Sequence, residues 1–157
     1  MPAILQVHNL VKKYGEFAAV KGISFDIQEG EIFSLLGPNG AGKTTTISVL
    51  STLYAPTSGD AVVGGHSVVK EPMAVRRLIG VVPQDLAIYD ELSARENLSF
   101  WGQMYGLSGK ALKTRIDEVL EQIGLSERAN SRVKTFSGGM KRRVNIGVGL
   151  LHKPRLL

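Results

Sequence analysis

The hydrophobic and polar positions alternate near the N-terminus, and this pattern predicts short strands. Leu5–Leu10 and Gly22–Ile27 each alternate, with a polar turn at Gln28–Gly30 behind the second run. Two adjacent alternating runs predict an antiparallel layer. Glu31–Leu36 is instead a mostly continuous apolar run, which is typical of a buried parallel strand. It ends at the helix and strand breakers of Gly37–Gly40.

Helical spacing of the apolar positions first appears after this glycine-rich cluster. Lys43–Leu50 predicts a helix, and Thr57–Val69 predicts a short strand with a turn. Glu71–Leu78 predicts one short helix, and Ile79–Val82 a second buried strand that Pro83 closes. The first half of the chain therefore predicts several strands and, among them, a buried strand that is followed by a glycine-rich loop and a helix.

The second half of the chain has a helical pattern. Ser93–Glu96 is a capping box that opens a helix. Lys110–Ile123 carries one apolar stripe, and a last helix is expected from Ser137 to about His152. Arg155–Leu157 then looks like the first residues of a strand. The predicted plan is a mixed sheet followed by a helical segment.

Length and composition set limits on the class of protein. The chain has 157 residues, 43% of them hydrophobic, which fits about one globular domain. It has no cysteine, which excludes a disulfide scaffold, a thiolate zinc site and a cysteine nucleophile. The N-terminus does not resemble a signal peptide, and no apolar run approaches the roughly 18 residues of a membrane span. The cytoplasm is the expected compartment.

The net charge of +5 is distributed unevenly along the chain. Residues 1–109 contain 8 Lys and Arg against 10 Asp and Glu, whereas residues 110–157 contain 11 against 4. No acidic residue follows Glu127. The basic excess therefore lies in the last third of the chain. Such a positive charge is consistent with a nucleic acid or an anionic membrane as the partner.

The strongest chemical motif is Gly37–Thr44, which fits G-x-x-x-x-G-K-[ST] between a predicted strand and a predicted helix. Glycines allow successive backbone N–H groups to point at phosphate oxygens, and the helix N-terminus adds partial positive charge. Lys43 is expected to bridge the β- and γ-phosphates, and the Thr44 hydroxyl to bind Mg²⁺. The motif predicts binding of a nucleoside triphosphate.

A second candidate phosphate-binding helix start lies at Ser137–Gly139. Ser137 is a suitable N-cap, and the two glycines expose backbone N–H groups. Taken alone, this tripeptide is equally consistent with an ordinary helix cap. The following Lys141–Arg143 are consecutive, so on a helix they spread around the axis instead of forming one basic stripe.

Four motifs together give the sequence a resemblance to the ATP-binding cassette (ABC) family. Phe136–Met140 is similar to the LSGGQ signature, with Phe for Leu and Met for Gln, and Gly37–Thr44 matches Walker A. Gln84 matches the Q-loop glutamine, and Tyr14 the aromatic residue on which adenine stacks. On spacing alone, Tyr14 also fits a strand-end aromatic of the core, and Gln84 an ordinary loop amide. The motif variants resemble the subgroup that serves exporters of drugs, lipids or polysaccharides.

The resemblance implies an α/β fold: a P-loop NTPase core with an N-terminal antiparallel β layer and an inserted helical subdomain, incomplete at the C-terminus. It divides the chain into residues 1–85 (core and β layer), 86–145 (helical subdomain) and 146–157 (start of the Walker B strand). Lys43, Gln84 and Ser137 would be catalytic, and Thr44 and Gln84 would bind Mg²⁺. The implied ATP contacts are Tyr14, Gly37, Pro38, Asn39, Gly40, Ala41, Gly42, Lys43, Thr44, Thr45, Ser137, Gly138 and Gly139.

The family also implies partners and a missing element. Its Walker B Asp-Glu pair, which serves Mg²⁺ and the attacking water, has no counterpart here, so the chain is expected to bind ATP but hydrolyse it poorly. A complete subunit would energise a separate transmembrane permease from the cytoplasmic face of the membrane. It would pair head to tail with a second nucleotide-binding subunit, with no specific nucleic acid. The alternatives are a soluble ABC protein that acts on nucleic acid or ribosomes, and an inactive fragment.

Overall fold

The computed structural model describes residues 3–157 and divides into two compact units. The first unit comprises the chain up to Ile79 together with Leu156. The second comprises Gly80–Arg155 together with Leu157. All strands of the described residues lie in the first unit, and each unit has its own apolar core.

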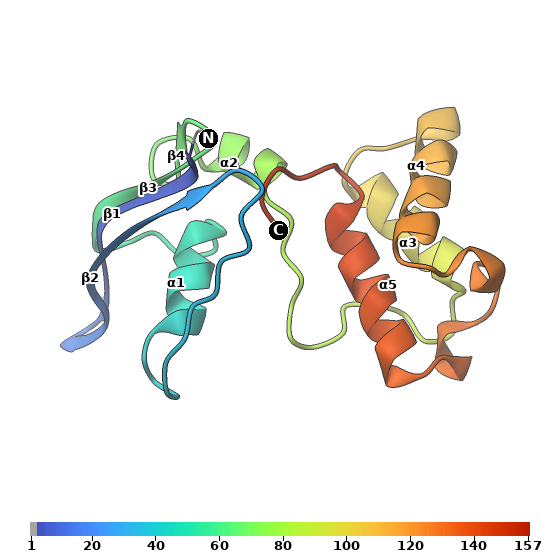
Figure 1. Ribbon diagram of the computed structural model, residues 1–157, viewed down its shortest axis with the longest axis horizontal. Coiled ribbons are helices and arrows are strands. Elements are labelled where there is room, and N and C mark those ends of the chain that lie inside the picture. Colours follow the sequence, from blue (N-terminus) through green and yellow to red (C-terminus); the bar gives the residue numbers. More distant parts are fainter. Residues whose placement is uncertain (1–2) are drawn as a thin grey trace. The chain divides into compact units, whose positions relative to one another are not determined.

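The first unit is built on a four-stranded antiparallel sheet in the order β2-β1-β3-β4 (Figure 1). Its strands are β1 (Ala3–Tyr14), β2 (Phe17–Gln28), β3 (Ser58–Val63) and β4 (His66–Ser67). Leu5 of β1 lies opposite Ile27 of β2 and Val63 of β3, so alternate apolar side chains share one face. The predicted antiparallel layer is confirmed.

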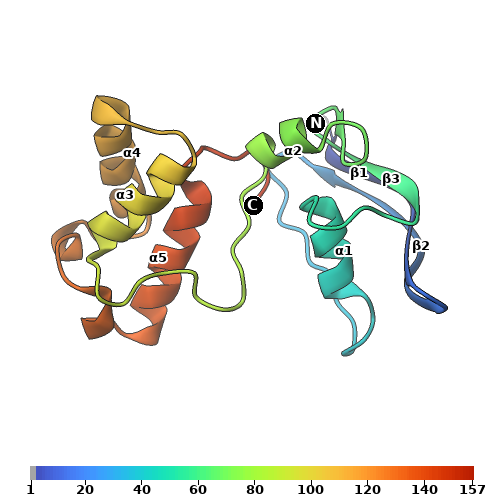
Figure 2. The same ribbon diagram turned by 180° about the vertical axis from the view of Figure 1, so that it is seen from behind.

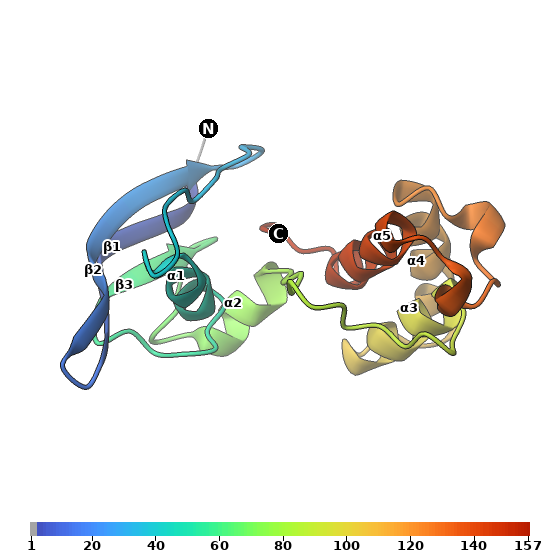
Figure 3. The ribbon, with the colours of Figure 1, turned by 90° about the horizontal axis from the view of Figure 1, so that it is seen from below.

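Helices α1 (Lys43–Leu50) and α2 (Pro72–Leu78) lie on one side of the curved sheet (Figure 3). Val49 of α1 and Val75 of α2 are fully buried against the sheet. Burial of such a side chain contributes roughly 1.5–3 kcal/mol, so these contacts fix α1 and the loop that precedes it. The predicted helix after the glycine-rich cluster is confirmed.

The second unit packs three helices around one apolar core (Figure 2). They are α3 (Ala94–Met104), α4 (Gly109–Gln122) and α5 (Gly138–Leu150), with the 3-10 turns η1 (Ser126–Arg128) and η2 (Val133–Thr135) between α4 and α5. The predicted capping box is present, because Ser93 accepts from the Glu96 backbone and Glu96 accepts from the Ser93 backbone. Local polar pairs therefore set where α3 begins.

The prediction of a buried strand at Glu31–Leu36 was wrong. This segment is not a strand, and its side chains are largely exposed, with Ile32 at 97% and Leu36 at 90%. The Phe33 ring stacks on Phe25 of β2, with ring centroids 5.0 Å apart. A strand needs a neighbouring strand for its backbone groups, and no described residue of 3–157 pairs with this one.

The strands predicted at Ile79–Val82 and Arg155–Leu157 are reduced to a single bridge. Ile79 and Leu156 pair as an isolated parallel bridge, and the Leu156 N–H donates to the Leu78 carbonyl. Gly80, Val81 and Val82 are not in a strand. An apolar run predicts a strand only where tertiary structure supplies a second run beside it.

Candidate functional site

The glycine-rich segment Gly37–Gly42 forms an exposed loop that leads into α1. Gly42 is the N-cap of α1 with φ of 86°, a left-handed conformation that favours glycine. A Cβ at Gly42 would lie 2.2 Å from the Ala19 carbonyl oxygen of β2. Gly40 also has positive φ (84°) but faces open space. The loop backbone therefore packs closely against β2 at Gly42, whereas at Gly40 it faces open space.

Lys43 folds back over this loop. Its ammonium donates hydrogen bonds to the carbonyl oxygens of Gly37 and Pro38, which closes the loop around the side chain. Thr46 fixes the helix start, since its hydroxyl donates to the Gly42 carbonyl at 2.8 Å. Thr44 is exposed in the first turn, where backbone N–H groups lack partners within the helix. The loop thus offers an amine, a hydroxyl and free amides to one ligand.

Tyr14 lies at the end of β1, in the same unit as the glycine-rich loop. Tyr14 is 46% exposed, and its ring meets that of Tyr54 edge to face, with centroids 6.4 Å apart. The Lys12 ammonium lies 5.2 Å from the Tyr14 ring and donates to the Ala55 carbonyl at 2.8 Å. Sequence reasoning missed Tyr54 and Lys12, because only folding brings the end of β1 beside the segment after α1.

Ser137 caps α5 in the second unit. Its hydroxyl accepts from the Met140 N–H at 3.2 Å. A Cβ at Gly138 would meet nothing within 4 Å, and one at Gly139 would reach only the Ser137 hydroxyl at 4.0 Å. Packing therefore does not require these glycines, so they leave the helix start open to a ligand. Phe136 anchors the turn, because it is buried in the core of the unit.

Gln84 is exposed in the loop between Val82 and α3. The loop backbone around it is held by α5: Arg142 donates to the carbonyl oxygens of Pro83 and Gln84 at 2.6 and 3.3 Å. Asn145 donates to the Pro83 carbonyl as well. The backbone of the Gln84 loop is thus fixed while the Gln84 side chain faces solvent.

The predicted site residues are divided between the two units. Tyr14 and Gly37–Thr45 belong to the first unit; Gln84 and Ser137–Gly139 belong to the second. The suggested Mg²⁺ ligands Thr44 and Gln84 therefore come from different units. Among residues 3–157, no three His, Asp or Glu side chains gather as a metal site. The donors of the glycine-rich loop nevertheless suit the phosphates of a nucleotide with its Mg²⁺.

A family model described as ABC transporter matches residues 20–157, most of the chain. The chain belongs to the ABC transporter family. It is 55% identical over 154 residues to the linearmycin resistance ATP-binding protein LnrL of Bacillus subtilis, covering 98% of this chain and 50% of LnrL. It is 45% identical over 152 residues to the doxorubicin resistance ATP-binding protein DrrA of Mycobacterium tuberculosis, covering 96% of this chain and 46% of DrrA.

Solved structures give the same assignment. The ABC chain resembles cbiO1 of Clostridium perfringens, part of the ABC transporter complex cbiONQ, with a TM-score of 0.88 and 29% identity over 98% of this chain and 63% of cbiO1. It resembles the ADP conformation of MJ1267, an ATP-binding cassette of an ABC transporter, with a TM-score of 0.85 and 26% identity over 98% of this chain and 66% of that one. The α/β ABC fold is confirmed, and the chain spans about half the length of LnrL and DrrA.

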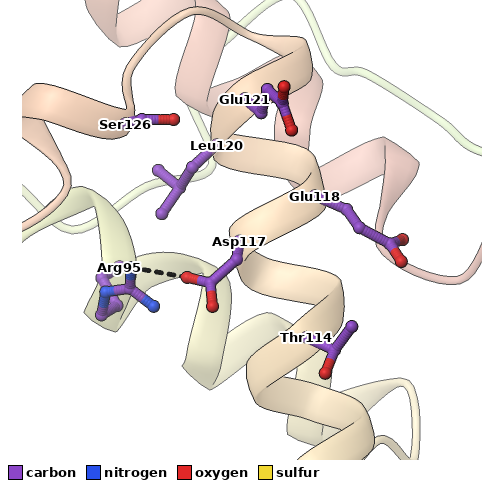
Figure 4. Close-up of a pocket in the computed structure, with 7 residues that line it drawn as sticks. All are labelled: Arg95, Thr114, Asp117, Glu118, Leu120, Glu121 and Ser126. Carbon is purple, nitrogen blue, oxygen red and sulfur yellow. Dashed lines mark ion pairs between the residues drawn. The ribbon is translucent and has the colours of Figure 1, made fainter.

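The ABC chain also has a shallow cavity of about 550 Å³ in its second unit, and none of its lining residues belongs to the four family motifs (Figure 4). An ion pair of 2.7 Å joins Arg95 of α3 to Asp117 of α4 beside it. Glu118 on the same helix has a pKa below its usual range, because Arg115 and then Lys153 hydrogen-bond its carboxylate. This acidic hollow does not suit an anionic nucleotide. Its lining residues are Arg95, Thr114, Asp117, Glu118, Leu120, Glu121 and Ser126.

Sequence reasoning also missed Asn145, which is 1% exposed in the middle of α5. The sequence does contain a signal for a buried amide at this position. Asn145 follows Val144 and precedes Val148 by three residues, so it lies among the apolar positions that α5 buries. A buried amide requires hydrogen-bond partners, which predicts a specific polar contact. The sequence does not reveal the partner, which lies about sixty residues away, in the Gln84 loop.

No helix among residues 3–157 is both long enough and apolar enough to cross a bilayer.

Proposed function

We propose that this chain is the nucleotide-binding part of the ATP-binding subunit of an ABC exporter. The observation that carries the proposal is the loop Gly37–Gly42, which leads into α1 with Lys43 inside it and an exposed Thr44 behind it. Two similar proteins, LnrL and DrrA, are named as ATP-binding proteins of drug resistance. These names support an exporter of drug-like molecules as the complete assembly.

In this proposal, the loop amides and Lys43 bind the phosphates of ATP. Lys43 exchanges its carbonyl acceptors for phosphate oxygens, which are stronger acceptors because they are charged. Tyr14 stacks on adenine, with Tyr54 and Lys12 fixing its ring. Thr44 and Gln84, which belong to different units, would be the Mg²⁺ ligands that the family resemblance implies, and Mg²⁺ would supply neutralisation of the phosphate charge. The remaining implied ATP contacts of the loop and first turn are Gly37, Pro38, Asn39, Gly40, Ala41, Gly42 and Thr45.

Ser137, Gly138 and Gly139 contact a nucleotide held by a second copy in the proposed head-to-tail dimer. The open space over both glycines supports this role. Ser137→Ala in the complete subunit should reduce turnover far more than the nucleotide affinity of the monomer. Equal loss of both would contradict the dimer.

The permease partner is proposed to dock on the second unit, at the cytoplasmic face of the membrane. Tyr89 of the Gln84 loop and Phe100 of α3 form an exposed edge-to-face pair, with ring centroids 5.1 Å apart. Met104, further along α3, is 70% exposed. Exposed aromatic and methionine side chains are enriched at protein interfaces. Co-purification with a membrane subunit supports this partner; co-purification with ribosomes supports the soluble alternative.

The basic last third is not proposed to bind nucleic acid specifically. Its consecutive cations make contacts within the protein: Lys141 pairs with Asp90 at 2.7 Å, and Arg142 and Arg143 donate to backbone carbonyls. Arg115 is buried, with hydrogen bonds to the end of α5. These cationic side chains thus form ion pairs and hydrogen bonds between segments of the second unit.

The decisive experiment measures MgATP binding by the chain with Lys43→Ala. Affinity should fall at least about tenfold, the loss expected for one or more charge-assisted hydrogen bonds. Lys21→Ala, an exposed lysine of β2, is the matched control and should bind ATP normally. Equal affinity of both variants would refute the nucleotide site.

Turnover by these 157 residues is proposed to be negligible, since no carboxylate follows Glu127 in them. A steady-state ATPase assay that finds Lys43-dependent turnover at ordinary transporter rates would overturn this. An absence of MgATP binding, measured by thermal shift, would favour the inactive-fragment alternative.

A further inference from the structure

The loop that carries Gln84 is attached to α5 by a buried amide. Asn145 accepts from the Ala87 N–H at 3.0 Å and donates to the Pro83 carbonyl at 3.1 Å. Both bonds are made by a side chain that is 1% exposed. One amide therefore holds the loop on both sides of Gln84.

Arg142, one turn earlier on α5, adds a second attachment. Its guanidinium donates to the Pro83 carbonyl at 2.6 Å and to the Gln84 carbonyl at 3.3 Å. The Pro83 carbonyl thus accepts from both side chains. Hydrogen bonds from a charged donor are roughly twice as strong as those between neutral groups.

The chain that follows is held to the same unit as far as the start of α3. Asn97 of α3 accepts from the Tyr89 N–H at 2.7 Å and donates to the Tyr89 carbonyl at 2.9 Å. Lys141 pairs with Asp90 at 2.7 Å. The Asn97 amide also donates to the Ser93 carbonyl at 3.0 Å, so residues 83–93 have attachments at their beginning, middle and end.

We propose that Arg142 and Asn145 are positioning residues that make the Gln84 loop move as one body with the start of α5. Gln84 and Ser137 would then keep a constant separation during the nucleotide cycle. The effect on turnover rests on the proposed function, because it requires Gln84 to act at the nucleotide. The attachment itself does not depend on that function.

A purely structural role for the two side chains gives different expectations. If Arg142 only stabilised the unit, its removal would lower stability and leave the loop position and the catalytic constant of the folded protein unchanged. Arg143 provides the comparison, because it is adjacent on α5 and also donates to backbone carbonyls, those of Ile123 and Gly124. Its contacts lie at the end of α4, outside the Gln84 loop.

The first experiment measures the loop position directly. The chain has no cysteine, so Asp85→Cys and Lys113→Cys place nitroxide labels on the loop and on α4 of the same unit. Pulsed electron paramagnetic resonance should give a narrow distance distribution that is unchanged by MgATP. Arg142→Ala should broaden it, whereas Arg143→Ala should not. A distribution that stays narrow in Arg142→Ala would overturn the proposal, as would a shift with MgATP in the unaltered loop.

The second experiment measures turnover in the transporter reconstituted with its permease. Arg142→Ala should lower kcat roughly tenfold to a hundredfold, the loss expected for a displaced catalytic group, with KM for ATP within about twofold. Arg142→Lys retains a charged donor and should restore most of kcat. Arg143→Ala should retain nearly all of it. Equal losses in Arg142→Ala and Arg143→Ala would contradict the positioning role.

Asn145→Ala would leave buried loop groups unpaired and lower the stability of the unit, which would obscure any effect on loop position. The proposal is therefore tested with the Arg142 variants. If the unaltered transporter hydrolyses no ATP, the proposed function fails, while the distance measurement still decides whether the loop is attached.

Discussion

Gly42 shows how strongly one position is constrained by two separate effects. Its φ is 86°, and a Cβ would overlap the Ala19 carbonyl. Gly40, two residues earlier, shares the positive φ but has open space around it. Substitutions at Gly40 and Gly42 can therefore distinguish the cost of backbone strain, which both would have, from the cost of steric overlap, which only Gly42 would have.

Gly42→Ala should lower the free energy of unfolding by about 2–5 kcal/mol, the sum of left-handed strain and overpacking. Gly40→Ala should lower it by only about 1–2 kcal/mol, for strain alone. Urea titration followed by circular dichroism measures both. Similar losses in the two variants would show that Ala19 does not constrain the loop.

Among the elements, the beginnings of α3 and α4 differ although both have serine at the N-cap. Ser93 is buried and completes a capping box with Glu96, whereas Ser108 makes no capping hydrogen bond with its side chain. Both helices lie in the second unit, so substitutions in them report on the same core.

Ser93→Ala should destabilise the second unit by about 1–2 kcal/mol, since it leaves a backbone donor of α3 unpaired. Ser108→Ala should change the unfolding free energy by less than about 0.5 kcal/mol. Chemical denaturation of each variant supplies the measurement. A larger loss at Ser108 would contradict the assigned caps.

The same cap predicts how acid affects α3. The Glu96 carboxylate accepts from the Ser93 backbone N–H, and this bond holds the pKa of Glu96 below its usual range. A depressed pKa stabilises the fold above the pKa of the unfolded chain, about 4.3, and that contribution is lost as the pH falls through the folded value.

Unfolding midpoints measured from about pH 6 down to pH 3 should fall less steeply in Glu96→Gln than in the unaltered chain. Gln keeps an oxygen acceptor for the cap but does not titrate. Glu121→Gln, at an exposed position of α4, serves as the control. An identical acid dependence in Glu96→Gln and the unaltered chain would rule out this linkage.

For the whole molecule, the most unusual feature is an apolar segment without a strand partner. Residues 32–36 belong to no strand or helix, and Ile32 and Leu36 are almost fully exposed. Within the described part of the chain, β1 has partners on both sides. The two segments should therefore differ sharply in local stability.

Hydrogen exchange followed by mass spectrometry should show this difference. Amides of residues 32–36 should exchange within about tenfold of the unfolded rate, while those of Leu5–Val7 in β1 should be protected by several orders of magnitude. Phe17–Gln28 of β2, an edge strand of the described sheet, provides an intermediate reference. Protection of residues 32–36 equal to that of β1 would mean that the segment is paired in solution.

The candidate site could be predicted only in part. The Gly37–Thr44 motif and the Ser137 cap are visible in the sequence, because each depends on residues close together in the chain. Attachment of the Gln84 loop by Arg142 and Asn145 could not be predicted, because the partners are separated by about sixty residues.

The sequence by itself determined the features that short-range physics controls: the alternating hairpin of β1 and β2, the capping box at Ser93, and the glycine-rich loop before α1. Tertiary structure decided which apolar runs became strands. Glu31–Leu36 and Ile79–Val82 both have a strand pattern, yet only Ile79 pairs. The physical reason is that a helix or a cap satisfies its backbone within a few residues, whereas a parallel strand depends entirely on hydrogen bonds from a distant neighbour.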